Sequence, residues 1–277
     1  MFRRTGLVLA VLGALAAVQV ASAAFPSPFA AQGGEGVLSN DGSLRFVALR
    51  GGEEATVISA TQTSDGSKWK SQAVAGSFGI PMLTQKGPGG GMFRDGSTFV
   101  LQSTGYYATT QFMLINTQDL ATRDSIALKG TFAFDALSPD GSRLYLIQHR
   151  SNQDIQHYTV RAYDLKAHKL LPGRIADKTQ KGWVMQGWPV ARTTSDTGRW
   201  VYTLYANPGG VPFIHALDTV KGVAHCIGIP WPANDSNQSP LFSYTLSLAG
   251  TKLAVKLNDG TTYRFVNLAN WKVSKKG

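Results

Sequence analysis

The stretch "FDALSPDGSRLYLIQH" (134–149) contains two short, mainly apolar runs on either side of the turn sequence Ser-Pro-Asp-Gly. An Asp-Gly pair favours the positive φ of a tight turn, and each flanking run has the length of a strand. The stretch therefore predicts a β-hairpin. Asp140 is expected to serve the turn, so it is not counted as a catalytic carboxylate.

Weaker copies of this hairpin return along the chain at intervals of about fifty residues. The glycines of the five turns are Gly42, Gly96, Gly141, Gly198 and Gly250. A second hairpin follows the first in each unit. Its turn begins at an Asp or Asn, whose side chain can bind the backbone that follows. These residues are Asn116, Asp164, Asp218 and Asn267, with Asp65-Gly66 in the same place in the first unit. Each unit is therefore predicted to contain four strands, A to D.

Four-stranded antiparallel units repeated along one chain are typical of a β-propeller. The sequence thus predicts an all-β fold in which residues 24–277 form a single domain. Five blades spanning residues 36–275 are expected, and six or seven irregular blades are the alternative. No segment after the N-terminus has the pattern of a long amphipathic helix.

The third unit also resembles a known family. Its stretches "SPDGSRLYLIQ" and "VRAYDLKAHKLL" resemble the repeats of bacterial secreted WD-repeat-like and YVTN-type β-propellers. The residues that carry the likeness are Ser138, Pro139, Asp140, Gly141, Tyr163 and Asp164. The resemblance implies the propeller fold. It indicates little about function, because propellers include both binding scaffolds and enzymes.

The N-terminus has the pattern of a secretory signal peptide over residues 1–23. Arg3 and Arg4 precede an apolar run, and Ala21-Ser22-Ala23 matches a cleavage site. The run is short for a transmembrane helix, which needs roughly 20 apolar residues. We therefore expect an extracellular or periplasmic, envelope-associated protein without a transmembrane span after processing. An uncleaved membrane anchor is the alternative.

The charge balance favours anionic partners. The chain has 27 Lys and Arg against 17 Asp and Glu, a net charge of +10. Outside the cell, such a charge suits contact with anionic wall polymers, acidic glycans or envelope proteins, and export argues against nucleic acid. Cys226 is the only cysteine, so neither an internal disulfide nor a cysteine-based metal site is expected. No cofactor is predicted.

The longer connections of the repeat identify a candidate ligand-binding face. The B–C and D–A connections lie on one face of a propeller, and here they are longer than the turns of the other face. Residues 77–92 and 176–188 are two of the expected D–A connections. Aromatic rings and cations in these connections could stack on sugars and bind acidic groups. The predicted ligand-binding residues are Tyr106, Tyr107, Arg150, Lys178, Lys181, Trp183, Trp188 and Trp231. A purely structural role, in which the aromatic rings fill the blade junctions, is the competing interpretation.

An extracytoplasmic, lactonase-like hydrolase with a site at the channel mouth is the alternative function. His149, Asp154 and His157 would be its first candidates, because both histidines flank one polar connection. His215 and His225 are expected to be cross-strand neighbours that could begin a metal site. The sequence offers no third ligand, so no metal is predicted. It also contains no G-x-S-x-G, H-E-x-x-H or P-loop motif.

Overall fold

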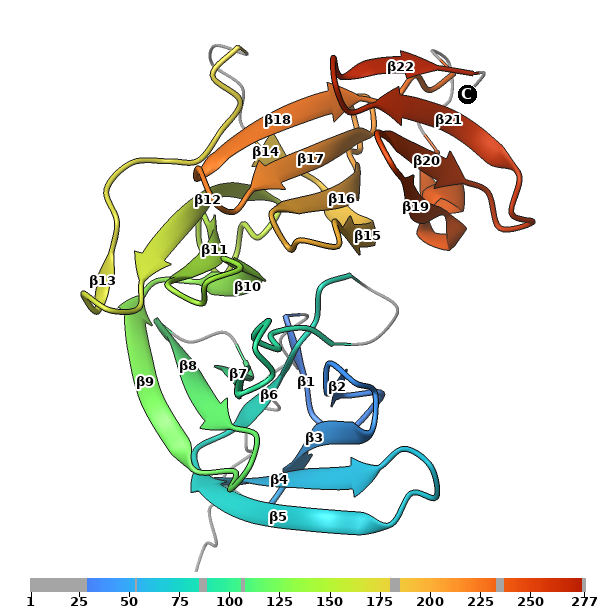
Figure 1. Ribbon diagram of the computed structural model, residues 1–277. Coiled ribbons are helices and arrows are strands. Elements are labelled where there is room, and N and C mark those ends of the chain that lie inside the picture. The colour runs from blue at the N-terminus through green and yellow to red at the C-terminus, as the bar shows by residue number, and fades with distance from the viewer. Residues whose placement is uncertain are drawn as a thin grey trace, which may run out of the picture.

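The computed structural model describes residues 29–52, 54–84, 89–105, 108–179, 185–232 and 237–275. The predicted signal peptide therefore lies outside the described residues. The described chain forms five antiparallel sheets and one short 3₁₀ helix, and it contains no α-helix. The sheets follow one another around a common centre, with their first strands innermost (Figure 1). The predicted all-β fold with five four-stranded blades is confirmed.

The first two blades cover the N-terminal part of this arc. Blade 1 consists of β2 (Val37–Leu38), β3 (Leu44–Arg50), β4 (Ala55–Gln62) and β5 (Lys68–Ala75). Blade 2 consists of β6 (Phe78–Pro81), β7 (Thr98–Ser103), β8 (Thr109–Asn116) and β9 (Thr122–Lys129). A short extra strand, β1 (Ala30–Ala31), pairs antiparallel with β6 and so lies at the inner edge of blade 2.

The other three blades follow in chain order. Blade 3 consists of β10 (Phe132–Leu137), β11 (Arg143–His149), β12 (His157–Asp164) and β13 (Lys169–Leu170), with β14 (Met185–Gln186) also paired to β12. Blade 4 consists of β15 (Trp188–Thr194), β16 (Trp200–Ala206), β17 (Phe213–Asp218) and β18 (Val223–Gly228). The helix η1 (Ser239–Ser243) precedes blade 5, which consists of β19 (Thr245–Ala249), β20 (Lys252–Lys256), β21 (Thr262–Asn267) and β22 (Lys272–Ser274).

Two predicted connections contain strands. Residues 77–92 were expected to be a D–A connection, but Phe78–Pro81 form β6, the buried inner strand of blade 2. Within residues 176–188, Met185–Gln186 form β14. The expectation failed because both strands are only two to four residues long, and they obtain their stability from pairing with strands distant in sequence. A run this short shows no periodicity of its own.

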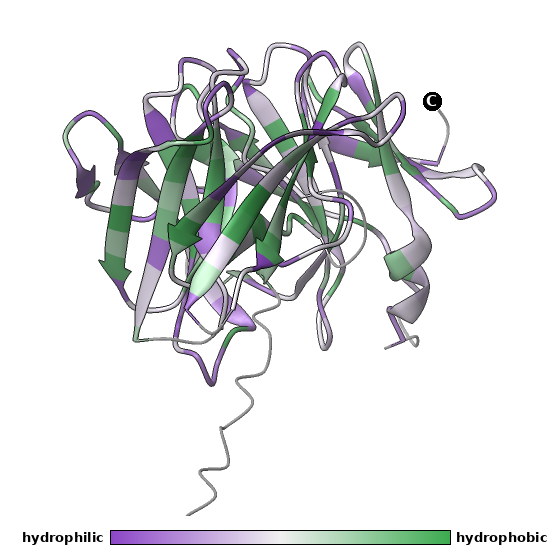
Figure 2. Cartoon of the chain, turned by 90° about the horizontal axis from the view of Figure 1, so that it is seen from below, coloured by the Kyte–Doolittle hydropathy of each residue, from purple (hydrophilic) through white to green (hydrophobic). Residues whose placement is uncertain are grey.

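The five blades are held together by four hydrophobic cores, one at each contact between consecutive blades. Each core is formed by alternate residues of two facing sheets, and Phe46 of blade 1 packs on Phe99 of blade 2 at 4.9 Å between ring centroids. Figure 2 shows hydrophobic residues concentrated on the strands and hydrophilic residues in the connections. The described residues form no fifth core between blade 5 and blade 1. The ring is therefore open on that side (Figure 1).

The two terminal blades differ in the faces they turn to the opening. The strand register places Leu38 and Leu49 on the face of blade 1 that is turned away from blade 2, and they are 40% and 41% exposed. On blade 5, Lys252 and Lys272 lie on the face turned away from blade 4, and both are exposed. Both faces are mixed in character, because Arg45 lies beside Leu38 on blade 1 and the pair Ala254–Phe265 lies beside the lysines on blade 5.

Tight turns at the predicted glycines join the first two strands of blades 1, 3, 4 and 5, whereas in blade 2 the turn at Gly96 ends a longer connection between β6 and β7. Gly42, Gly141 and the equivalent glycines all have φ between 55° and 74°. In the quoted hairpin, the Asp140 carboxylate accepts hydrogen bonds from the Ser138 hydroxyl at 2.5 Å and from the Ser142 backbone N–H at 3.1 Å. The same arrangement at Asp41 lowers the pKa of its carboxyl group to about 2, chiefly through the Ser39 hydroxyl. These carboxylates therefore act as turn-forming groups.

In blades 2 to 5, the turns between the third and fourth strands also begin at the predicted Asp and Asn side chains. Asn116, for example, accepts a hydrogen bond from the backbone N–H of Gln118 at 2.8 Å. The residue four positions later has positive φ in each case, and among these four turns it is glycine only at Gly222. The others are Leu120, His168 and Trp271, with φ of 62°, 49° and 61°. A residue with a Cβ is strained in this region by roughly 1–2 kcal/mol. In blade 1 the turn begins at Gln62 and not at the predicted Asp65, and its fourth following residue is Gly66.

We expect His168→Gly to raise the free energy of unfolding by about 1 kcal/mol, because it removes the Cβ from a left-handed position. The side chain of His168 is 61% exposed, and its contact with Asp124 at 3.5 Å is an exposed ion pair that contributes little. Urea unfolding of the two proteins measures the difference. His168→Ala is the matched control, because it removes the imidazole and keeps the strain. Equal stability of the Gly and Ala variants would contradict the prediction.

Candidate anion-binding site

A cavity of about 750 Å³ lies on blade 3, at the end where the longer connections gather. It is lined by Gln148, His149, Arg150, His157, Tyr158, Thr159, Arg161, Arg174 and Gln186. Three of these are arginines, and no Asp or Glu is among them. The cavity thus concentrates positive charge at one place on a blade.

Strand alternation explains why these polar side chains share one face. Gln148 on β11 pairs with Thr159 on β12, and Arg161 lies two residues further along β12. Residues two apart in a strand point to the same side of a sheet. Tyr158 and Val160 alternate with Thr159 and Arg161 along β12. They point to the other side of the sheet and belong to the core shared with blade 4.

Hydrogen bonds fix the innermost of the three arginines. Arg161 donates from Nη1 to Oε1 of Gln148 at 2.6 Å and from Nη2 to the carbonyl oxygen of Leu171 at 3.0 Å. Its Nε is buried and has no hydrogen-bond partner among the described residues. This guanidinium group is therefore held in place by two protein acceptors.

The outer two arginines are more available to a ligand. The Arg150 side chain is 75% exposed, and its only ion pair among the described residues is with Asp154 at 3.6 Å. Arg174 is exposed, and no hydrogen bond or ion pair joins it to another described residue. Guanidinium groups bind carboxylates, sulfates and phosphates through paired N–H groups. The pocket therefore has the chemistry of an anion-binding site.

Asp154 and His157 form a hydrogen-bonded pair beside this pocket. Nδ1 of His157 lies 2.8 Å from Oδ1 of Asp154, which also accepts the backbone N–H of His157 at 3.2 Å. The hydrogen bond from His157 is the main reason why the pKa of Asp154 is lowered. The pair holds the imidazole in one orientation at the pocket edge.

His149, the third residue of the predicted hydrolase set, lies in a different environment. Its ring stacks on Phe29 at 4.4 Å, and its Nδ1 is 2.7 Å from the carbonyl oxygen of Ile155. A carbonyl oxygen only accepts, so Nδ1 carries the proton. Burial lowers the pKa of His149 to about 4. An imidazole with such a low pKa is a weak base at neutral pH.

The four predicted ligand-binding residues that the structure describes do not meet at one site. Of the described ones, Arg150 lines the blade 3 pocket and Lys178 is exposed in the loop after blade 3. Trp188 lines a narrow central cavity with Phe29 and His149. Trp231 packs against Tyr244 and Tyr263 of blade 5, at 6.4 and 5.9 Å between ring centroids. Tyr106, Tyr107, Lys181 and Trp183 lie outside the described residues.

Sequence reasoning missed Arg161 and Arg174. The alternation in "HYTVRAYD" (157–164) could have placed Arg161 on the same side as Thr159. Arg174 has no comparable signal, because a single bridge between Ile175 and Val160 brings it to the blade. Its position depends on a pairing that no local pattern encodes.

The expected pairing of His215 with His225 is wrong. His215 pairs with Cys226, and His225 pairs with Ala216. The turn closes between Asp218 and Val223, so the register is shifted by one residue and the two imidazoles lie on opposite faces of the sheet. His215 is buried, whereas His225 stacks on Trp271 at 4.7 Å. Within the described ranges, no three His, Cys, Asp or Glu side chains are placed to hold a metal ion.

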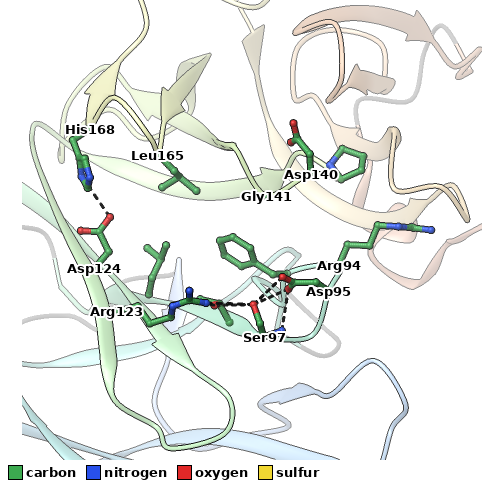
Figure 3. Close-up of a pocket in the computed structure, with 13 residues that line it drawn as sticks. Arg94, Asp95, Ser97, Arg123, Asp124, Asp140, Gly141, Leu165 and His168 are labelled. Atoms are coloured by element: carbon green, nitrogen blue, oxygen red, sulfur yellow. Dashed lines mark hydrogen bonds and ion pairs between the residues drawn. The ribbon is translucent and has the colours of Figure 1, made fainter.

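A second cavity, of about 470 Å³, lies between blades 2 and 3 on the opposite, turn-bearing face (Figure 3). Its charged groups are of both signs, and His168 reaches across to Asp124. The Asp95 carboxylate is engaged by the backbone N–H and hydroxyl of Ser97 at 2.9 and 2.8 Å. Arg123 donates to the Thr98 hydroxyl at 2.8 Å. These groups are used by the turns and strands themselves, so the blade 3 pocket is the better candidate.

No protein-family model matches the sequence, and the search of the curated proteins finds no match either. None of the described helices is long and apolar enough to cross a membrane.

Solved structures do show a similarity. Hydrazine synthase from Kuenenia stuttgartiensis matches with a TM-score of 0.50 at 14% identity, over 82% of this chain and 62% of that chain. The β-propeller domain of Cps50 (Swd1) from Myceliophteria thermophila matches at 0.49 and 10% identity, over 82% and 64%. TolB from Acinetobacter baumannii matches at 0.42 and 16% identity, over 80% and 51%. The chain thus spans less than two thirds of each of these chains. At such identities the likeness concerns the fold alone.

Proposed function

We propose that this chain is an exported, envelope-associated binding module that recognises an acidic glycan. The observation that supports the proposal is the convergence of Arg150, Arg161 and Arg174 on one cavity. The amides of Gln148 and Gln186 and the hydroxyl of Thr159 line the same cavity and suit the hydroxyl groups of a sugar. The signal-peptide pattern and the excess of Lys and Arg over Asp and Glu agree with an anionic extracellular ligand. Membership of the WD-repeat-like or YVTN-type family remains a prediction from the third repeat.

Arg150 and Arg174 are proposed to contact the ligand directly, whereas Arg161 orients the inner wall of the pocket. A charge-assisted hydrogen bond contributes about 1.5–3 kcal/mol, and 1.4 kcal/mol corresponds to a tenfold change in affinity. The double variant Arg150→Ala/Arg174→Ala is therefore expected to weaken binding by at least about tenfold. Isothermal titration calorimetry with polygalacturonate measures this, and uncharged dextran is the comparison polymer.

The matched control is Lys252→Ala/Lys272→Ala, which removes the same charge from the free face of blade 5. A site-specific interaction predicts less than about a twofold loss in this variant. Equal losses in both double variants would show diffuse charge attraction and would overturn the proposal. Tight binding of poly-glutamate with no binding of polygalacturonate would identify an acidic protein segment as the ligand.

A second candidate function is hydrolysis, because Asp154 and His157 form a hydrogen-bonded pair of 2.8 Å at the pocket edge. An oriented imidazole can take a proton from water or from a substrate hydroxyl. Hydrolysis of 4-nitrophenyl acetate or γ-butyrolactone by the wild-type protein, lost in His157→Gln, would support this function. Equal rates in the two proteins would exclude a role for the pair.

A further inference from the structure

Another cleft, of about 650 Å³, opens at the centre of the arc beside blades 4 and 5. Its walls are β15, the segment from η1 into β19, and the residues Leu83 and Thr84 in the connection between β6 and β7 of blade 2. The cleft is separate from the anion-binding pocket on blade 3, with which it shares no lining residue. The strand β15 borders the cleft with its inner edge, which is the edge that does not pair with β16.

The strand register shows which backbone groups face this cleft. The backbone N–H of Ser195 donates to the carbonyl oxygen of Trp200 at 2.9 Å, which closes the hairpin between β15 and β16. Backbone groups alternate between the two edges of an antiparallel strand. Thr193 therefore bonds toward β16, opposite Tyr202, and the N–H and C=O groups of Arg192 and Thr194 point to the inner edge.

These inner-edge groups are available for pairing. The backbone N–H and C=O groups of Arg192 and Thr194 point away from β16. Among the described residues, no hydrogen-bond partner lies on this inner side. Both residues line the cleft. An unpaired strand edge is a template for an added strand, because it offers alternating donors and acceptors at strand spacing.

The neighbouring blade closes its equivalent edge with side chains. Gln102 donates from Nε2 to the carbonyl oxygen of Phe132 at 3.1 Å and accepts the backbone N–H of Phe134 at 2.9 Å, both on β10. Arg192 also donates to the carbonyl oxygen of Asp135 on the same strand. The inner edge of β10 is thus occupied, whereas that of β15 is open.

The molecule itself uses strand addition at another inner edge. β1 pairs antiparallel with β6, the innermost strand of blade 2, with Ala31 opposite Ile80. Two residues suffice to form this pairing. The inner edges of the arc can therefore accept an extended segment.

The side chains of the cleft suit an extended peptide. Phe242, Tyr244 and Leu246, at alternate positions of one segment, are partly buried against the core between blades 4 and 5 and give the cleft an apolar strip, and Leu83 also lines the cleft. Thr193, Thr194, Ser243, Thr245 and Asn258 provide hydroxyl and amide groups between them. A strand directs alternate side chains to opposite sides, so one set can meet the apolar strip while the other faces solvent.

We infer that the inner edge of β15 binds an extended peptide segment of a partner protein by strand addition. The backbone of that segment pairs with Arg192 and Thr194, and its alternate apolar side chains pack on Phe242, Tyr244 and Leu246. Main-chain hydrogen bonds supply affinity in this mode, and the side-chain contacts supply selectivity. This site is independent of the proposed glycan site.

A phage-displayed library of random twelve-residue peptides, selected on the intact protein, provides the probe. The enriched peptides are then titrated into Thr194→Pro and Thr194→Ala. Proline removes the inner-edge N–H and places its ring where the added strand would lie, while the bond of Thr193 to β16 is kept. We expect about a tenfold or greater loss of affinity in Thr194→Pro and less than a twofold change in Thr194→Ala.

Hydrogen exchange on the wild-type protein gives a second readout that does not depend on the fold of a variant. Bound peptide is expected to slow exchange of the backbone amides of Arg192 and Thr194. Unchanged affinity in Thr194→Pro, protection confined to another strand, or failure to enrich any peptide would each overturn the inference. Arg150→Ala/Arg174→Ala should bind the peptides normally, so failure at one site is distinguishable from failure at the other.

Discussion

Acidification from pH 7 to pH 4 is expected to lower the free energy of unfolding by about 6 kcal/mol, through two buried histidines. Burial lowers the pKa of both His149 and His215 from 6.5 to about 4. Below pH 6.5 the unfolded chain binds a proton at each of these residues, and the folded protein does not do so until about pH 4. Stability therefore falls as the pH falls through this window, by roughly 3 kcal/mol for each histidine.

The charged neighbours do not reverse this direction. Asp154 favours the protonated form of His149, and Asp135 and Asp177 favour that of His215, but burial outweighs them in both cases. The Arg192 guanidinium opposes protonation of His215. The turn carboxylates have pKa values lowered from 3.8, so their contributions are lost only at more acidic pH. The buried histidines therefore lower the stability between pH 6.5 and pH 4, whereas the turn carboxylates do so only at more acidic pH.

Urea unfolding at pH 4, 5, 6 and 7 measures this dependence. His149→Gln and His215→Gln are each expected to remove about half of the slope between pH 6.5 and pH 4. His168→Gln is the matched control, because that imidazole is 61% exposed. If the double variant His149→Gln/His215→Gln keeps the full slope, other groups cause the acid sensitivity.

The second large effect is expected at the ion pair between Asp135 and Arg192, which joins the inner strands of blades 3 and 4. Nη1 of Arg192 lies 2.8 Å from Oδ1 of Asp135, and the two side chains are only 10% and 3% exposed. A bulge between Phe134 and Ala136 turns Asp135 toward the neighbouring blade. Asp135→Ala leaves the guanidinium charge buried without its partner and is expected to cost about 3–5 kcal/mol of unfolding free energy.

A double-mutant cycle separates the pair from the packing around it. The variant Asp135→Leu/Arg192→Met replaces both charges by apolar groups and is expected to recover most of the lost stability. Urea unfolding of the wild-type protein, Asp135→Leu, Arg192→Met and the double variant supplies the coupling energy. A loss below about 1 kcal/mol for Asp135→Ala would show that the carboxylate contributes no net stabilisation.

Much of the architecture can be predicted from the sequence, because hairpins are local. Asp140 and Gly141 specify a turn through their own side chain and backbone, so the spacing of such turns reveals the blades. The open ring has no such local signal. It depends on how the free faces of blade 1 and blade 5 meet, and the residues of these faces are distant in sequence.

The candidate site was predictable only in part. Arg150 lies directly after a predicted strand, so the repeat alone assigns it to the propeller face that carries the longer connections. Arg174 reaches the same pocket through a single bridge at Ile175, and no periodic pattern encodes that contact. Trp231, predicted at the ligand face, packs on aromatic rings of blade 5, which only the three-dimensional contacts reveal.

The four interblade cores have a consequence for cooperativity. In a closed ring every blade has two neighbours, whereas in the described part of this chain blades 1 and 5 each share a hydrophobic core with only one. The stability of such a linear array is a sum of blade terms and nearest-neighbour terms, so partial unfolding begins at its ends. Blade 5, whose free face carries Lys252 and Lys272, resembles the polar terminal unit of a solenoid repeat protein. The chain should therefore fray from its terminal blades before the central three unfold.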